Sequence, residues 1–251
     1  MADGILVTAA AVAVTGVLLG VARWAIPGET KQEHHEVLIA IHQMVGMLYA
    51  ILLAFVVIIV WEAASKADTD AQAEANKLSQ IYFTARGLPQ PQSTQLTRLA
   101  RDYAADVVDE EWPLMRRGRT SPHARELVAQ MRVTANSLRP TNIHDEVLMT
   151  QTLDAINALV DTRRERTAAI EPPVPAVLWT GLIVGAVITV GFTFFYDYTR
   201  YLPHFLMVSA MTALVAFLLW LVWEMSYPFD GPTGVGPDAF VQVLERFKEF
   251  A

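Results

Sequence analysis

The chain has 251 residues, of which 53% are hydrophobic and only 18% are charged, a balance too apolar for an average soluble domain. Its formal net charge of −7 argues against a nucleic-acid-binding surface, and no cysteine occurs that could form a disulfide. The apolar residues are grouped in blocks, which is typical of a membrane protein.

Four uncharged segments are each close to the ~20 residues that a helix needs to cross the hydrocarbon core. They are residues 4–22, 45–61, 176–196 and 205–223. We expect four transmembrane helices, the second of which can extend beyond its uncharged part at both ends. The first segment has no basic stretch before it, so a cleaved signal peptide is not expected.

The second of these helices is predicted to continue far into water. No glycine or proline interrupts the sequence from Met47 to Arg86, although charges recur from Glu62 onward. One face, rich in alanine, steps by three or four residues, and so lets a neighbouring helix approach closely. This face carries Val60, Ala64, Ala67, Ala71, Ala75, Leu78, Tyr82 and Ala85. We expect one unbroken helix over 45–86, ended by Gly87 and Pro89.

The polar middle of the chain is also predicted to be helical. Helices are expected over 93–117, from Ser121-Pro122 to 138, and from Thr141 or Asn142 to 170, with proline-containing breaks between them. Trp112 is expected in the core, and Gly181, Gly185 and Gly191 are expected to allow close helix packing in the membrane. After a tail rich in proline and glycine, a short amphipathic helix is predicted over 238–250.

The fold class is therefore all-α, with four transmembrane helices and a helical extramembrane domain inserted between the second and third. The expected parts are 1–61, the helical domain 62–172, 173–227, and the C-terminal loop and helix 228–251. Lysine and arginine are more numerous near the membrane on the side of the middle domain. The positive-inside rule then places that domain and both termini in the cytoplasm.

Two short charged stretches were weighed as candidate sites. Glu33 to Glu36 reads EHHE, but the spacing does not place its ligands on one helix face, so an interfacial polar turn is favoured over a metal site. Arg163, Arg164 and Arg166 precede the third crossing. They are candidates for binding anionic lipid or for ion pairs between subunits, and the alternative is a simple membrane anchor. No cofactor is expected.

Four motifs, in this order, resemble a bacterial bestrophin-like family whose name supplies no established activity. They are EANKLSQIYFTARGLP, DEEWPLMRRG, INALVDTRRERTAAIEPPVPAVLW and YPFDGPTGVGPDAF, and the resemblance covers about residues 45 to 245. It implies a multi-pass protein of the bacterial inner membrane. The order of elements also resembles bestrophins, pentameric ion channels whose second helix lines the pore. The acidic calcium-clasp cluster of animal bestrophins is absent here, so calcium gating is not carried over.

If the side of the second helix that carries Glu62 faces the axis of such a ring, the pore-lining residues follow by helical spacing. They are Leu48, Ile51, Leu52, Phe55, Ile59 and Glu62, with His42 and Gln43 at the outer mouth. This arrangement would place a hydrophobic constriction above an acidic ring, which favours cations.

Three functions remain open on the sequence. The first is a homo-oligomeric ion channel, expected to be a pentamer in contact with membrane lipids. The second is a non-conducting scaffold or sensor whose cytosolic helices bind a protein partner. A membrane enzyme is disfavoured, because no acid, base or metal ligands converge in the sequence.

Overall fold

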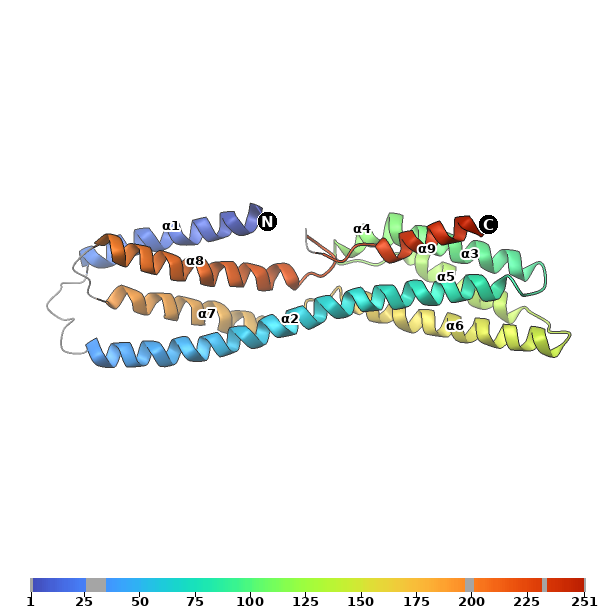
Figure 1. Ribbon diagram of the computed structural model, residues 1–251, viewed down its shortest axis with the longest axis horizontal. Coiled ribbons are helices and arrows are strands. Elements are labelled where there is room, and N and C mark those ends of the chain that lie inside the picture. The colour runs from blue at the N-terminus through green and yellow to red at the C-terminus, as the bar shows by residue number, and fades with distance from the viewer. Residues whose placement is uncertain (1, 26–34, 197–200, 232–233, 251) are drawn as a thin grey trace. The chain divides into compact units, whose positions relative to one another are not determined.

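A computed structural model describes residues 2–25, 35–196, 201–231 and 234–250. These residues form helices and their connections, with no strand among them, which confirms the all-α prediction (Figure 1). They divide into two compact units. We call Met1–Trp61 with Pro173–Ser226 the membrane unit, and Glu62–Pro172 with Tyr227–Ala251 the polar unit.

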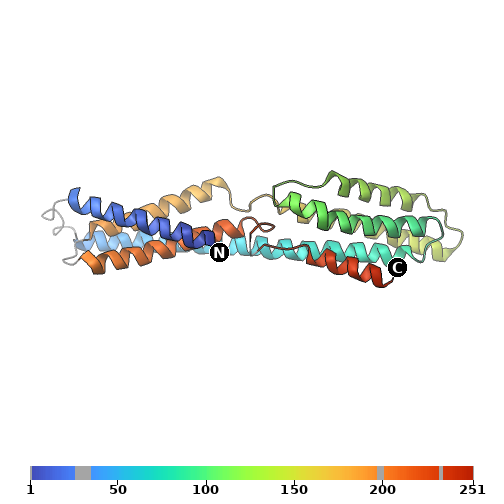
Figure 2. The ribbon, with the colours of Figure 1, turned by 90° about the horizontal axis from the view of Figure 1, so that it is seen from above.

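The membrane unit contains the apolar helices. They are α1 (Ala2–Ala25), the first part of α2 (His35–Ala85), α7 (Ala176–Phe192) with the 3-10 turn η3 (Thr193–Phe195), and α8 (Tyr201–Met225). Each of the four long helices is apolar enough to cross a membrane, which indicates a multi-pass membrane protein. Helix α1 packs along α8, as Figures 1 and 2 both show, and α7 also contacts α8.

Small residues bring the membrane helices together at particular points. A side-chain carbon added at Gly185 would lie 2.6 Å from the ring of Tyr49, so only glycine admits this contact between α7 and α2. Gly181 similarly faces Leu52, at 3.7 Å. At Gly191 the prediction of close packing is not met among the described residues, none of which has an atom within 4 Å of the added carbon.

Helix α2 is unbroken over 51 residues, which confirms the predicted continuity. At a rise of about 1.5 Å per residue it is on the order of 75 Å long. It starts at His35, well before the uncharged stretch, and ends in a turn where Gly87 N–H donates to the Thr84 carbonyl at 3.1 Å. The alanine face does meet close neighbours, but they belong to the same chain: Ala67, Ala71 and Ala75 lie in the core of the polar unit.

The remaining helices form the polar unit. They are α3 (Gln92–Asp106), the π-helical stretch η2 (Val107–Glu111), α4 (Trp112–Met115), α5 (Pro122–Asn136), α6 (Ile143–Ala168) and α9 (Asp238–Glu249). The predicted caps are present. The Ser121 hydroxyl accepts from the Ala124 N–H at 3.2 Å, and the Asn142 side chain accepts from the Asp145 N–H at 2.9 Å.

Pro113 explains the π-helical stretch that precedes it. A proline inside a helix has no N–H to donate, and its ring clashes with the carbonyl four residues earlier. The chain widens by one residue before this point, and the Trp112 N–H bonds the Val107 carbonyl, five residues back. Trp112 is buried, as predicted, and so is Glu111 at the end of the widened stretch.

Helix α9 completes the core of the polar unit. Its Phe247 ring stacks on Tyr82 of α2, with centroids 3.9 Å apart, and Phe240 is fully buried. The core otherwise consists of apolar side chains from every long helix of the unit, which include Leu78, Ile81, Leu96, Tyr103, Met131, Ile156 and Leu159.

The alanine face of α2 gives a first prediction. Ala67→Leu inserts three carbons where no surface is exposed, so it should destabilise the polar unit by about 1–3 kcal/mol through overpacking. The thermal unfolding midpoint of the detergent-solubilised protein measures this. Ala129→Leu, the same change at an exposed position of α5, should leave the midpoint within about a degree, because Ala and Leu have similar helix propensities. Equal midpoints for both variants would contradict the close packing of α2.

Candidate functional site: the outer face of α2 and a buried charge cluster

Most of the predicted pore-lining residues are not covered by their own chain. Leu48 is 68% exposed and Phe55 63% exposed, and Ile51 and Ile59 are also exposed. Leu52 differs, because it is half-buried against the core of the membrane unit. The side of α2 that faces this core instead carries Tyr49, Leu53, Val56 and Val60, all of them buried.

The uncovered positions recur at intervals of seven residues along α2. The exposed residues at the first four positions of this series, here called the outer stripe, are Leu48, Phe55, Glu62 and Thr69. The next two positions contact α9 or the residue after it, because Asn76 lines a pocket with α9 and the Phe83 ring packs edge-on against Phe247 and Phe250. A spacing of seven keeps residues near one side of a helix. The outer stripe is apolar until Phe55 and polar from Glu62 onward. Asp70, the residue after Thr69, is buried.

Glu62 is exposed and makes no ion pair among the described residues. Lys66 lies one turn away, but its ammonium donates to both carboxylate oxygens of Asp70, at 2.8 and 2.9 Å. The same Lys66 ammonium also lies 3.9 Å from the Glu165 carboxylate, so it is not paired with Glu62. The Glu62 side chain is therefore left without a cationic partner among the described residues.

The two residues predicted at the outer mouth have different environments. The ring of His42 stacks on Phe192 with centroids 5.7 Å apart, and its Nδ1 lies 2.6 Å from the Tyr196 hydroxyl. His42 is thus half-buried against the end of α7, whereas Gln43 is exposed. Glu33 and His34 of the EHHE stretch lie outside the described residues.

The three arginines considered for lipid or subunit contacts lie on one turn of α6 but have different environments. Arg166 is fully buried, and only 11% of the Arg163 side chain is exposed. Both form ion pairs inside the chain, so neither is presented freely at the surface. Arg164 is exposed, and for it the contact with lipid or another subunit stays a prediction.

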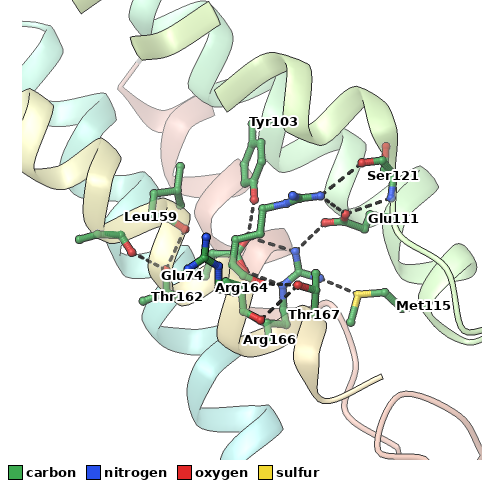
Figure 3. A network of polar contacts seen from close by, with 12 residues as sticks. Glu74, Tyr103, Glu111, Met115, Ser121, Leu159, Thr162, Arg164, Arg166 and Thr167 are labelled. Carbon is green, nitrogen blue, oxygen red and sulfur yellow. Dashed lines mark hydrogen bonds and ion pairs between the residues drawn. The ribbon is translucent and has the colours of Figure 1, made fainter. Parts of the chain in front are cut away.

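Arg166 is the centre of a buried charge cluster, which Figure 3 shows. Its Nε and Nη2 donate to the two carboxylate oxygens of Glu74, at 2.6 and 3.1 Å, the fork geometry that suits a guanidinium. Nη2 also donates to Glu111 at 2.6 Å, and Nη1 contacts the Met115 sulfur. Burial opposes the charge, but Glu74, together with Tyr103 and Glu111, outweighs it and raises the pKa of Arg166 above its ordinary value.

Glu111 is the second junction of the cluster. One of its oxygens accepts from the Ser121 N–H at 3.1 Å and from Arg163, and the other accepts from Arg166. Burial raises the pKa of Glu111, but the two arginines outweigh it and hold that pKa below its ordinary value of 4.5. The Tyr103 hydroxyl donates to Glu74 at 2.5 Å, and burial together with that carboxylate raises the pKa of Tyr103 well above 10.0.

Aromatic rings and the C-terminal tail enclose this cluster. The guanidinium carbon of Arg166 lies 5.3 Å from the Trp112 ring centroid and 5.6 Å from that of Phe240, within cation–π range. The Trp112 ring N–H donates to the Val235 carbonyl at 3.0 Å. Each of the four motifs on which the family resemblance rests thus supplies part of one buried site.

The sequence did not lead us to pair Glu74 or Glu111 with Arg166. One signal was present, because Arg166, Leu159 and Thr152 are seven residues apart on α6, and the latter two face the core. An arginine on a buried helix face requires carboxylates. Which carboxylates these are depends on how three helices pack, and that is not written in local spacing.

The sequence profile of the Bestrophin-like domain matches residues 9–240, most of the chain, and confirms the resemblance drawn from the motifs. No curated protein gives a significant match.

The charge cluster predicts acid sensitivity. Because the Glu111 pKa is lower in the folded than in the unfolded protein, its carboxylate stabilises the fold above about pH 4.5. That contribution is lost as the pH falls further, through the folded pKa. The thermal midpoint should therefore drop on acidification below this pH. Glu111→Gln should reduce the free energy of unfolding at pH 7 by about 3–5 kcal/mol, because it leaves two arginines underpaired, and should therefore lower the thermal midpoint strongly.

The matched control is Glu110→Gln, which removes an exposed carboxylate from the preceding position. It should retain the midpoint at pH 7 and the acid slope of the unmodified protein. The Glu111→Gln variant should show a shallower decline between pH 5 and 3. If its slope equalled that of the unmodified protein, Glu111 would not be a source of the acid sensitivity.

Proposed function

The chain belongs to the bestrophin-like family, and from this premise we propose that copies of it assemble around an axis as an ion channel lined by α2. The observation that carries the proposal is the outer stripe. It is left uncovered along a helix whose opposite side is buried in both units. The described residues of one chain offer four candidate crossings, too few to enclose a water-filled path by themselves.

The composition of the outer stripe fits a pore better than a surface that contacts only lipid. In the membrane unit Leu48, Phe55 and the neighbouring Ile59 would form apolar rings, which gate ion flow by excluding water. Immediately beyond them, Glu62 would contribute one unpaired carboxylate per subunit. A ring of carboxylates attracts cations, so a cation preference follows.

The number of subunits is proposed from kinship alone. Bestrophins are pentamers, and a pentamer is the stoichiometry that the order of elements suggests for this chain. The alanine face of α2 gives no support to assembly, because its neighbours are in the same chain. Contacts between subunits would instead use surfaces that the single chain leaves exposed, and lipid would cover the remaining apolar residues of α1 and α8.

The orientation in the membrane follows from the distribution of basic residues, which favours a cytoplasmic polar unit in a bacterial inner membrane. A reporter inserted after Pro91, in the turn that precedes α3, tests this directly. Alkaline phosphatase, which is active only outside the cytoplasm, should be inactive there, and a fluorescent protein that folds in the cytoplasm should be bright. If only the phosphatase fusion were active, the polar unit would lie outside the cytoplasm, contrary to this proposal.

Phe55→Ala should raise single-channel conductance in planar bilayers, because removing the ring widens the narrowest apolar segment and lets water enter it. The control is Phe217→Ala, the same change at an exposed phenylalanine of α8, away from the proposed axis. It should leave conductance unchanged. Light scattering of the detergent complex should show an oligomer for the unmodified protein and for both variants.

Glu62→Gln should shift the reversal potential toward lower cation preference without changing the oligomer, because the carboxylate is exposed and unpaired. Glu146→Gln, which removes an exposed carboxylate from α6, should not shift it. If neither Phe55→Ala nor Glu62→Gln changes the currents, the outer stripe does not line the pore. If the purified protein is a monomer and carries no current, the channel proposal fails and the non-conducting scaffold takes its place.

A further inference from the structure

A groove between α5 and α6 in the polar unit collects positive charge. It has a volume of about 370 Å³ and is lined by four arginines: Arg125 and Arg132 from α5, and Arg163 and Arg164 from α6. No aspartate or glutamate is among its lining residues. The chain as a whole carries a formal net charge of −7, so this concentration of guanidinium groups runs against its composition.

Three of these four charges are not neutralised by an ion pair, the exception being Arg163, which pairs with Glu111. Among the described residues Arg125, Arg132 and Arg164 take part in no ion pair. Arg132 donates to the neutral amide oxygen of Asn157, at 2.9 Å. The nearby Glu126 lines a different groove, between α3 and α5, and bonds Gln130.

Arg163, which also lines the groove, is only partly hydrogen-bonded. Its Nη2 donates to Glu111 and to the Ser121 carbonyl, but its Nε is buried and has no hydrogen-bond acceptor among the described residues. A buried donor without a partner costs free energy comparable to a lost hydrogen bond.

We propose that this groove binds a phosphate-bearing anion. A guanidinium presents a planar fork of donors that matches phosphate oxygens, and several forks converging from two helices suit a compact anion with more than one charge. The apolar floor, formed by Val128 and Val160, can accommodate an uncharged part of the ligand. The phosphate group belongs either to a free solute or to the headgroup of an anionic lipid.

The proposal is tested with the full-length protein in a non-ionic maltoside detergent at constant ionic strength. Calorimetric titration with inorganic pyrophosphate probes a free solute. Native mass spectrometry after mixing with phosphatidic acid or zwitterionic phosphatidylcholine probes a headgroup. The groove variant is Arg125→Gln with Arg132→Gln, two exposed residues whose loss spares the core.

The control variant is Arg86→Gln with Arg119→Gln, which removes the same charge from exposed positions outside the groove. We expect the groove variant alone to weaken binding at least about tenfold, because each guanidinium supplies charge-assisted hydrogen bonds. Lysine at positions 125 and 132 should restore part of the affinity, since it keeps the charge without the fork. Circular dichroism verifies that all variants are folded.

The two probes separate the sources of the phosphate. Pyrophosphate binding that depends on the groove supports the proposal with a free solute as ligand. Selective loss of bound phosphatidic acid in the groove variant, without pyrophosphate binding, supports it with a lipid as ligand. The proposal is overturned if neither probe binds, or if both bind equally to the groove and control variants. Neither result depends on whether the protein conducts ions.

Discussion

The polar unit depends on the neutralisation of one buried guanidinium. Arg166 has no access to water, so its charge must be balanced within the core. Glu74 and Glu111 supply that balance, and Arg163 returns the group to electrical neutrality. Ion pairs as deep as these add little net stability over a well-packed apolar core, but they strongly penalise any arrangement in which one partner is missing.

That penalty links segments that are distant in sequence. Glu74 belongs to α2, Glu111 to the π-helical stretch, and Arg166 to α6, so all three must meet for any of them to be buried. The tail joins them through the contacts of Trp112 with Val235 and of Phe240 with the guanidinium. The motifs that identify the family thus describe a structural centre, and the proposed pore face draws on other residues.

Helix α2 consequently has two sides with different environments. One side is fixed by the cores of the two units, through Tyr49 and Val60 in one and Leu78 and Tyr82 in the other. The other side, the outer stripe, is free of such constraints. A similar division occurs within one turn of α6, where Arg166 enters the charge cluster while Arg164 reaches the arginine groove.

The sequence by itself determined the features that depend on local pattern. Uncharged blocks marked the four apolar helices, the absence of breakers predicted the continuous α2, and Ser121 and Asn142 located two helix starts, because hydropathy, steric rules and capping act over a few residues. Only the tertiary structure decided which charges meet. The local sequence did not distinguish the three arginines of the RRER stretch. Packing buried Arg166, placed Arg163 in an ion pair with Glu111, and left Arg164 exposed. Packing likewise gave the alanine face of α2 neighbours from its own chain. The cost of burying a charge and the fit of two surfaces both depend on helices that are far apart in the sequence, so local pattern could not predict them.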